Sequence, residues 1–160
     1  MTGACAHDHS QDGGLSGAPL EGALAGAETR MAAAGERMTS SRRRVLELLL
    51  QAGQPVKAYD LMAAFAPGEP NAKPPTVYRA LEFLEKQGLA HRIPSLNAYV
   101  ACRVEGGHDA AFLICDCCGV TLEIEPPRAS ALSQQAGQAG FAVSGVMLEA
   151  HGLCADCRTA

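Results

Sequence analysis

The chain has 160 residues, of which 48% are apolar, and a formal net charge of -4, which suits one globular domain or two small ones. It has no run near the roughly 18 apolar residues that a membrane helix needs, and no basic start followed by an apolar secretory segment. We therefore expect a cytoplasmic protein with no membrane contact. Seven cysteines in a reducing compartment favour metal or redox chemistry over a disulfide framework.

Charge is distributed unevenly along the chain. Residues 38–93 carry eight basic and five acidic side chains, whereas residues 1–37 carry two and five, and residues 94–160 carry three and seven. An acidic protein with a locally positive segment can still bind phosphates through that face. The net charge therefore does not exclude nucleic acid as a partner.

The N-terminal half has the pattern of a series of helices. Residues 1–20 are rich in Gly, Ala and Ser and are expected to be disordered, with a short helix following at about 21–35. Polar caps, an apolar run and a final glycine predict a helix within 38–53, and apolar residues at helical spacing predict another within 55–67.

The helix predicted at 74–88 has the clearest pattern. Its apolar positions recur at i, i+4 and i+7, and they are Val77, Leu81 and Leu84. Because that stripe must face a core, Tyr78 and Arg79 point away from it near the N-terminal end of the helix. Residues 89–93 and 98–102 then predict a β-hairpin around a turn. Helices followed by a hairpin indicate a winged helix, whose last helix would be the recognition helix.

Three consecutive arginines, Arg42, Arg43 and Arg44, stand at the start of the helix within 38–53. Runs of charge are usually solvated faces, but the N-terminal end of a helix does not favour cations. Their position therefore indicates a partner outside the protein.

Two C-x-x-C pairs lie far apart in the C-terminal half, Cys115 with Cys118 and Cys154 with Cys157. A structural zinc ion takes four thiolate or imidazole ligands in a tetrahedron, usually from two such pairs. The spacing therefore predicts a four-cysteine zinc site, which leaves Cys117 as a spare thiol. A pair of redox disulfides would use the same four thiols, and a measurement of zinc content separates the two interpretations.

A second set of metal ligands is spread around the hairpin. His91 would face Val100 across the hairpin, with Cys102 as its diagonal neighbour on the same face. His108 follows on a Gly-Gly loop, and Glu123 lies in an otherwise apolar strand. Together they offer a mixed tetrahedral set that suits Zn²⁺, although each has an ordinary alternative as a surface or core residue.

The C-terminal half also contains segments of alternating apolar residues. We expect a sheet from 110–114, 120–124 and 141–148, paired across a dimer and covered by a helix at about 127–139.

The strings AKPPTVYRALEFLEKQGLAHRI, AYDLM, NAYVAC, FLICDCCG and EAHGLCADC together resemble the ferric uptake regulator family, and within it the zinc-sensing branch, over about residues 36–158. The resemblance implies an α+β (mixed α/β) fold. A tail at 1–20 would precede a winged-helix DNA-binding domain at 21–101, a hinge at 102–109 and a zinc-binding α/β dimerisation domain at 110–160. It also implies a non-enzymatic homodimer that, when loaded with zinc, binds AT-rich palindromic operators in double-stranded DNA and represses zinc-uptake genes.

The resemblance also assigns roles to individual residues. Two Zn²⁺ ions per subunit are implied. The structural zinc ligands match Cys115, Cys118, Cys154 and Cys157, and the regulatory ligands match His91, Cys102, His108 and Glu123. The DNA contacts match Tyr78 and Arg79, with Tyr59 and Arg42 in support. Because a thiolate suits Zn²⁺ better than Fe²⁺ or Mn²⁺, Cys102 favours a zinc sensor.

The sequence departs from the family pattern in three places. The Thr-Pro-x-Arg opening of the first long helix is TSSR here, which keeps Thr39 and Arg42, and the loop between Cys102 and His108 is about two residues short. The N-terminal residues Cys5, His7 and His9 lie outside the pattern and are expected to chelate metal only weakly.

Two other functions remain open. The same regulator could sense iron, manganese or peroxide. Alternatively, His91, Cys102 and His108 could hold an open catalytic zinc with Glu123 as general base, as in a zinc hydrolase. The regulator predicts zinc-dependent DNA affinity, whereas the hydrolase predicts turnover.

Overall fold

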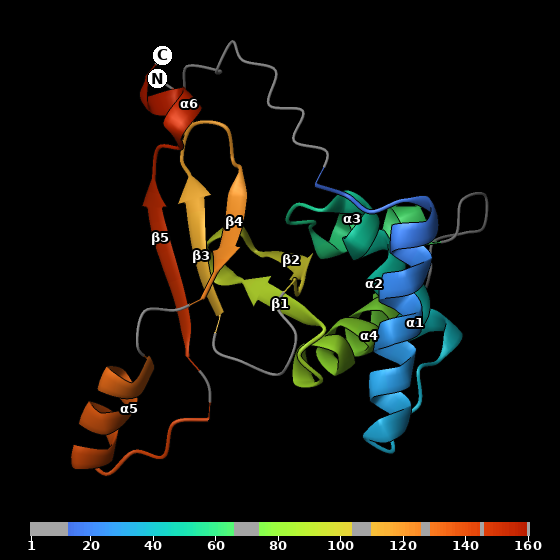
Figure 1. Ribbon diagram of the computed structural model, residues 1–160, viewed down its shortest axis with the longest axis horizontal. Coiled ribbons are helices and arrows are strands. Elements are labelled where there is room, and N and C mark those ends of the chain that lie inside the picture. The colour runs from blue at the N-terminus through green and yellow to red at the C-terminus, as the bar shows by residue number, and fades with distance from the viewer. Residues whose placement is uncertain (1–12, 66–73, 104–109, 126–128, 145, 160) are drawn as a thin grey trace. The chain divides into compact units, whose positions relative to one another are not determined.

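The computed structural model describes residues 13–65, 74–103, 110–125, 129–144 and 146–159. They form two compact units that divide between residues 107 and 108. The division falls within the predicted hinge, most of which lies outside the described residues together with His108. Figure 1 shows a helical N-terminal unit with a small hairpin and a C-terminal unit built on a sheet.

The N-terminal unit consists of helices followed by a two-stranded hairpin (Figure 1). Its elements are α1 (Gly17–Ala33), α2 (Ser40–Ala52), α3 (Ala58–Phe65), α4 (Pro74–Lys86), β1 (Ala90–Ile93), the 3-10 turn η1 (Pro94–Leu96) and β2 (Ala98–Ala101). The predicted helices and hairpin are therefore confirmed. Helix α1 begins at Gly17 with Leu20 buried, so the expectation of disorder up to residue 20 is wrong for the last four positions.

The core of this unit lies between the apolar faces of α1, α2 and α4. The stripe predicted for α4 is fully buried, and it packs with Leu24 from α1 and Val45 and Leu49 from α2. Thr39 is the N-cap of helix α2, and its side chain accepts the backbone N–H of Arg42 over 3.4 Å; Gly53 is the C-cap, in the left-handed conformation. The N-cap is therefore kept with Ser40 in place of the proline that the resemblance would lead one to expect.

The hairpin has the predicted register. His91 pairs with Val100, and Arg92 pairs with Tyr99. Val56 pairs with β2 as an isolated antiparallel bridge: its N–H donates to the Tyr99 carbonyl and its carbonyl accepts the Tyr99 N–H, both over 2.8 Å. The wing is thus held to the segment between α2 and α3, which completes the winged-helix architecture.

The C-terminal unit contains a three-stranded sheet in the order β4-β3-β5 (Figure 1). Its elements are β3 (Ala110–Cys115), β4 (Thr121–Ile124), α5 (Ala129–Gln138), β5 (Met147–Gly152) and α6 (Ala155–Arg158). Strand β4 runs antiparallel to β3, whereas β5 runs parallel to it after the crossover that contains α5.

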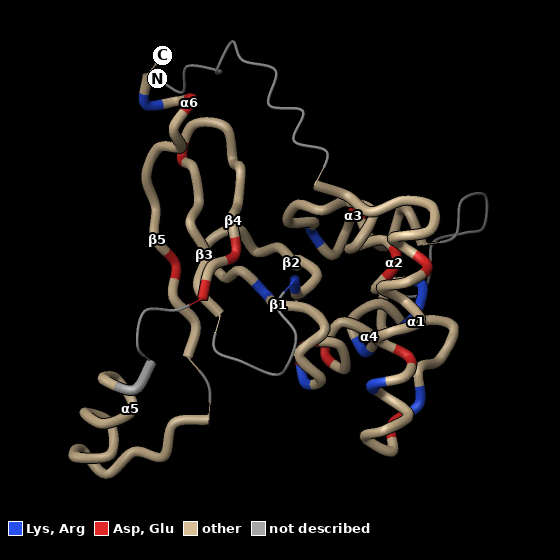
Figure 2. Tube along the Cα trace, in the orientation of Figure 1, with Lys and Arg blue, Asp and Glu red and all other residues tan. Residues whose placement is uncertain are grey.

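Two expectations for this unit need correction. The third strand lies at 147–152 rather than 141–148, because β5 pairs in parallel with β3 from Ala110 opposite Met147 to Cys115 opposite Gly152. The predicted helix forms as α5, but its side chains at 131–138 are exposed or half-buried, so it does not cover the sheet. Helix α5 has no charged residue along its described length (Figure 2) and leaves Leu132 exposed.

Within the described ranges, no helix is both long and apolar enough to cross a membrane.

Candidate metal centres and nucleic-acid interface

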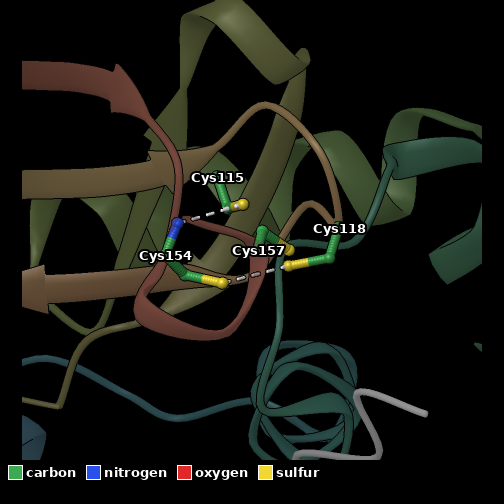
Figure 3. A group of neighbouring side chains, drawn as sticks. All are labelled: Cys115, Cys118, Cys154 and Cys157. Atoms are coloured by element: carbon green, nitrogen blue, oxygen red, sulfur yellow. Dashed lines mark hydrogen bonds between the residues drawn. The ribbon is translucent and has the colours of Figure 1, made fainter. Parts of the chain in front are cut away.

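The four cysteines of the two C-x-x-C pairs meet at one edge of the C-terminal sheet. Cys115 is the last residue of β3, and Cys118 lies in the turn that leads to β4. Since β3 and β5 are parallel, their carboxyl ends reach the same edge, where Cys154 follows β5 and Cys157 lies in α6. The order of strands therefore brings together two pairs that are far apart in the sequence (Figure 3).

The spacing of the sulfur atoms fits a zinc ion. Zn–S bonds of about 2.3 Å in a tetrahedron place the sulfurs about 3.8 Å from one another. The Sγ atoms of Cys118 and Cys154 are 3.8 Å apart, and all four sulfurs lie within 4.8 Å of one another. Cys117 is exposed and is not part of this group; it is disulfide-bonded, so the expectation of a spare thiol is wrong.

The surroundings of Cys115 favour a thiolate. Its sulfur accepts backbone N–H groups of Cys118 and Cys154, the latter over 3.3 Å, and these bonds lower the pKa of Cys115 to about 6. In contrast, burial raises the pKa of Cys157. One cysteine is thus ready to bind a cation near neutral pH, and the others would give up their protons as the metal binds.

His91 and Cys102 meet within the N-terminal unit. Both come from the hairpin: His91 is buried in β1, and Cys102 follows β2, where its backbone N–H bonds to the Leu89 carbonyl over 3.0 Å. A ring nitrogen of His91 and the sulfur of Cys102 lie within 4.8 Å of each other. These two predicted regulatory ligands are therefore close enough to share one ion.

The other two predicted regulatory ligands are Glu123 and His108. Glu123 is half-buried on β4 of the C-terminal unit, opposite Phe112 of β3. His108 lies outside the described residues. Their participation in a metal site stays a prediction.

The predicted DNA-contacting residues of α3 and α4 face solvent. Tyr78 and Arg79 are exposed on the first turns of α4, on the opposite side from the buried stripe, and Tyr59 near the start of α3 is 75% exposed. Large exposed aromatic side chains next to an arginine offer both hydrogen bonding and stacking to a ligand. The surface can therefore approach DNA, although their contacts with it remain a prediction.

The arginine run has partners inside the N-terminal unit, contrary to our expectation. Arg43 forms ion pairs with Glu21 and Glu28 of α1, at 3.0 and 2.9 Å. Arg44 donates to the last two carbonyls of α3, at 3.1 and 3.3 Å, and pairs with Glu47 at 2.9 Å. The C-terminal end of α3 carries partial negative charge, which favours this cation although the start of its own helix does not.

Arg42 also has partners within the unit. Its guanidinium carbon lies 3.4 Å from the ring centroid of Phe83 on α4, and its Nη1 donates to the carbonyl of Arg37 over 2.6 Å. Sequence reasoning missed the role of Phe83. Two features of the sequence could have predicted this contact. An arginine at the start of a helix needs a partner that compensates its charge, and the neighbouring helix carries an aromatic residue.

These features can be compared with known proteins. The model of the ferric uptake regulator family matches residues 33–151. The chain belongs to the ferric uptake regulator family. Within this family, the chain is 42% identical to the zinc uptake regulation protein of Escherichia coli (strain K12) over 137 residues, which cover 84% of this chain and 80% of that protein. It is 28% identical to the zinc uptake regulation protein of Mycobacterium tuberculosis (strain H37Rv) over 130 residues, which cover 81% of this chain and all of that protein.

Solved structures of family members share the fold. A zinc uptake regulator complexed with zinc and DNA superposes with a TM-score of 0.81 at 39% identity, covering 89% of this chain and 97% of that one. The crystal structure of holo XcZur gives a TM-score of 0.78 at 41% identity, covering 86% and 97%. The expected α+β fold with a winged helix is confirmed.

Proposed function

We propose that the protein is a zinc-responsive transcriptional repressor of the cytoplasm. When loaded with zinc, its homodimer binds AT-rich palindromic operators and represses zinc-uptake genes. The observation that carries this proposal is the meeting of His91 and Cys102 on the wing of a winged-helix unit, in a chain 42% identical to a zinc uptake regulation protein. A metal held by His91 and Cys102 would lie in the hairpin that directly follows the proposed recognition helix α4.

Two Zn²⁺ ions per subunit form part of the proposal. The first would be held by Cys115, Cys118, Cys154 and Cys157, and would stabilise the C-terminal unit. The second would be held by His91, Cys102, His108 and Glu123. The thiolate of Cys102 supports zinc over Fe²⁺ or Mn²⁺ at the second site, because soft ligands suit zinc.

The second ion would act by linkage. His91 and Cys102 belong to the N-terminal unit and Glu123 to the C-terminal unit, so an ion held by all of them would restrict the hinge and thereby the distance between the recognition helices of a dimer. By thermodynamic reciprocity, zinc and operator must then strengthen each other's binding by the same factor.

The homodimer has support in the exposed apolar side chains of the C-terminal unit. Leu113 and Leu122 are cross-strand partners, both exposed, and the exposed Leu148 of β5 lies opposite Ala111, on the same face of the sheet. Such side chains on neighbouring strands form an apolar surface that a second copy of the chain would cover.

DNA binding would divide between two kinds of contact. Arg79 would hydrogen-bond to a purine edge in the major groove, while Tyr78 and Tyr59 would contact mostly phosphates. All three side chains are exposed and therefore accessible to DNA.

The proposal is tested by fluorescence anisotropy with operator-like DNA while free zinc is buffered over a wide range, with Fe²⁺ and Mn²⁺ as comparisons. We expect steep, zinc-selective binding that is lost in the double variant His91→Ala, Cys102→Ser. The variant His7→Ala, Cys5→Ser removes the same two residue types from the N-terminal tail and should behave as wild type.

The outcomes separate the alternatives. Binding that is indifferent to zinc, or unchanged in the His91, Cys102 variant, would refute the sensor proposal. A stronger response to Fe²⁺ or Mn²⁺ would identify a sensor of another metal.

A further inference from the structure

The contact between Arg42 and Phe83 joins the first turn of α2 to the C-terminal half of α4. The guanidinium carbon lies 3.4 Å from the ring centroid, and Phe83 is only 8% exposed. At the same time, Nη1 donates to the carbonyl of Arg37, just before α2, over 2.6 Å. One face of the guanidinium and one of its donors are therefore already engaged within the protein.

This arrangement explains how the cation is tolerated at its position. The start of a helix carries partial positive charge, which disfavours an arginine. A cation over an aromatic face and a charge-assisted bond to a carbonyl both offset that cost. The same residue offers its backbone N–H to the Thr39 cap, so both its backbone and its side chain fix the start of α2.

Phe83 lies one helical turn after Arg79 on α4. The side chains of a helix reach about 6 Å from its axis, so a rotation of α4 by about 10° would move the Arg79 side chain by about 1 Å. A bidentate contact with a base tolerates little displacement, because its two hydrogen bonds must align together. The orientation of α4 therefore matters for recognition.

We propose that Arg42 is a positioning residue for DNA recognition: it holds Phe83 and thereby fixes the orientation of α4, rather than neutralising a phosphate itself. This inference rests on the proposed function, since it presumes that α4 is the recognition helix. It replaces the supporting DNA contact that the family resemblance implies for Arg42.

The two roles give different effects on DNA binding. Loss of a phosphate contact weakens binding about equally on all sequences and lowers the slope of log K against log salt by about 1. Loss of a positioning contact weakens binding to the preferred sequence selectively and leaves that slope unchanged. Lysine also separates the roles, because it keeps the charge but lacks the planar group that stacks on a ring.

The experiment uses full-length, zinc-loaded protein and two DNA duplexes. One is the sequence enriched from a random pool by the wild-type protein, and the other is its scrambled version. Affinity is measured on both at several salt concentrations for Arg42→Lys, Arg42→Gln, Phe83→Leu and Phe83→Tyr. Zinc content and the thermal unfolding midpoint of each variant show that it is folded.

We expect Arg42→Lys and Arg42→Gln to lose about 10- to 100-fold on the enriched sequence, little on the scrambled one, and to keep the wild-type salt slope. Phe83→Leu should match them, and the double variant Arg42→Lys, Phe83→Leu should be no weaker than either single variant. Phe83→Tyr, which keeps the aromatic face, should remain near wild type. If Phe83→Leu does not fold, the two Arg42 variants and Phe83→Tyr still decide the question.

The positioning role is overturned if Arg42→Lys binds as wild type while Arg42→Gln weakens binding equally on both duplexes and lowers the salt slope by about 1. A wild-type protein that binds neither duplex with zinc would refute the proposed function and this inference together. A wild-type protein that binds while its Arg42 variants behave as phosphate-contact variants would refute only the positioning role.

Discussion

The pair formed by His151 and Asp116 joins the end of β5 to the turn that carries Cys115 and Cys118. Nδ1 of His151 lies 3.0 Å from the Asp116 carboxylate, and its Nε2 lies 3.7 Å from Glu149. The hydrogen bond with Asp116 is the main cause that raises the pKa of His151, and Glu149 contributes less. The imidazolium is therefore favoured in the folded protein.

We predict that an NMR titration of the zinc-loaded protein gives a His151 pKa above the ordinary value of about 6.5. Asp116→Asn should return the pKa most of the way, and Glu149→Gln should lower it less, because Glu149 is farther from the ring. A raised folded-state pKa stabilises the protein below the unfolded-state pKa, and this benefit is lost as pH rises through the folded-state value. An unshifted His151 in the wild type would show that the pair does not persist in solution.

For individual residues, the sequence predicted the positions of the functional side chains better than it predicted their contacts. The pairing of His91 with Val100 followed from hairpin geometry, and the four sulfur ligands followed from their spacing. The arginine run was misinterpreted because the partners of Arg43 are 15 and 22 residues away, and two of the three partners of Arg44 are carbonyls at the end of another helix. Contacts over such separations depend on packing, which periodicity does not reveal.

Gly53, which follows α2, is in close contact with the segment before α1. It has a φ of 63°, and a Cβ at this position would clash with the backbone of Gly13. Arg103 donates to the carbonyls of both glycines, at 2.8 Å to Gly53 and 2.7 Å to Gly13. The end of α2, the segment before α1 and the residue after Cys102 thus meet at one point.

We predict that Gly53→Ala lowers the free energy of unfolding by at least about 1 to 2 kcal/mol, because it combines left-handed strain with the clash. Gly22→Ala is the matched control: it lies inside α1 with no atom within 4 Å of its added Cβ, and it should stabilise by about 0.5 to 1 kcal/mol. Urea denaturation of both variants provides the measurement. Equal stability of Gly53→Ala and wild type would contradict this close contact.

The elements with strong periodicity were predicted well, and β5 was not. Apolar alternation continues through 141–148, so the pattern alone gave no reason to place the strand six residues later. A stronger constraint was present in the sequence: Cys154 and Cys157 must reach Cys115 and Cys118, which requires a strand that ends just before Cys154. Strand β5 ends at Gly152, two residues before Cys154, and therefore meets this requirement.

At the scale of the whole molecule, the two units differ in how they are stabilised. The N-terminal unit has a continuous core from α1 to β2. The described part of the C-terminal unit buries few side chains, which are Ala110, Ala111, Phe112, Ile114, Cys115 and Cys157. Two of these six residues are proposed zinc ligands. A unit with so small a core needs a metal, a partner chain, or both.

We therefore predict that removal of the structural zinc unfolds the C-terminal unit and leaves the N-terminal unit folded. Structural zinc contributes about 10 to 16 kcal/mol in small zinc domains near neutral pH, which is comparable with the whole stability of a typical domain. Hydrogen exchange of Cys118→Ser should show loss of amide protection in the strands β3, β4 and β5, while the helices α1, α2 and α4 remain protected. Cys102→Ser, which also removes one cysteine but lies outside the four-sulfur group, should keep both units protected. If Cys118→Ser retained full protection in the C-terminal unit, its stability would come from packing and dimerisation rather than from zinc.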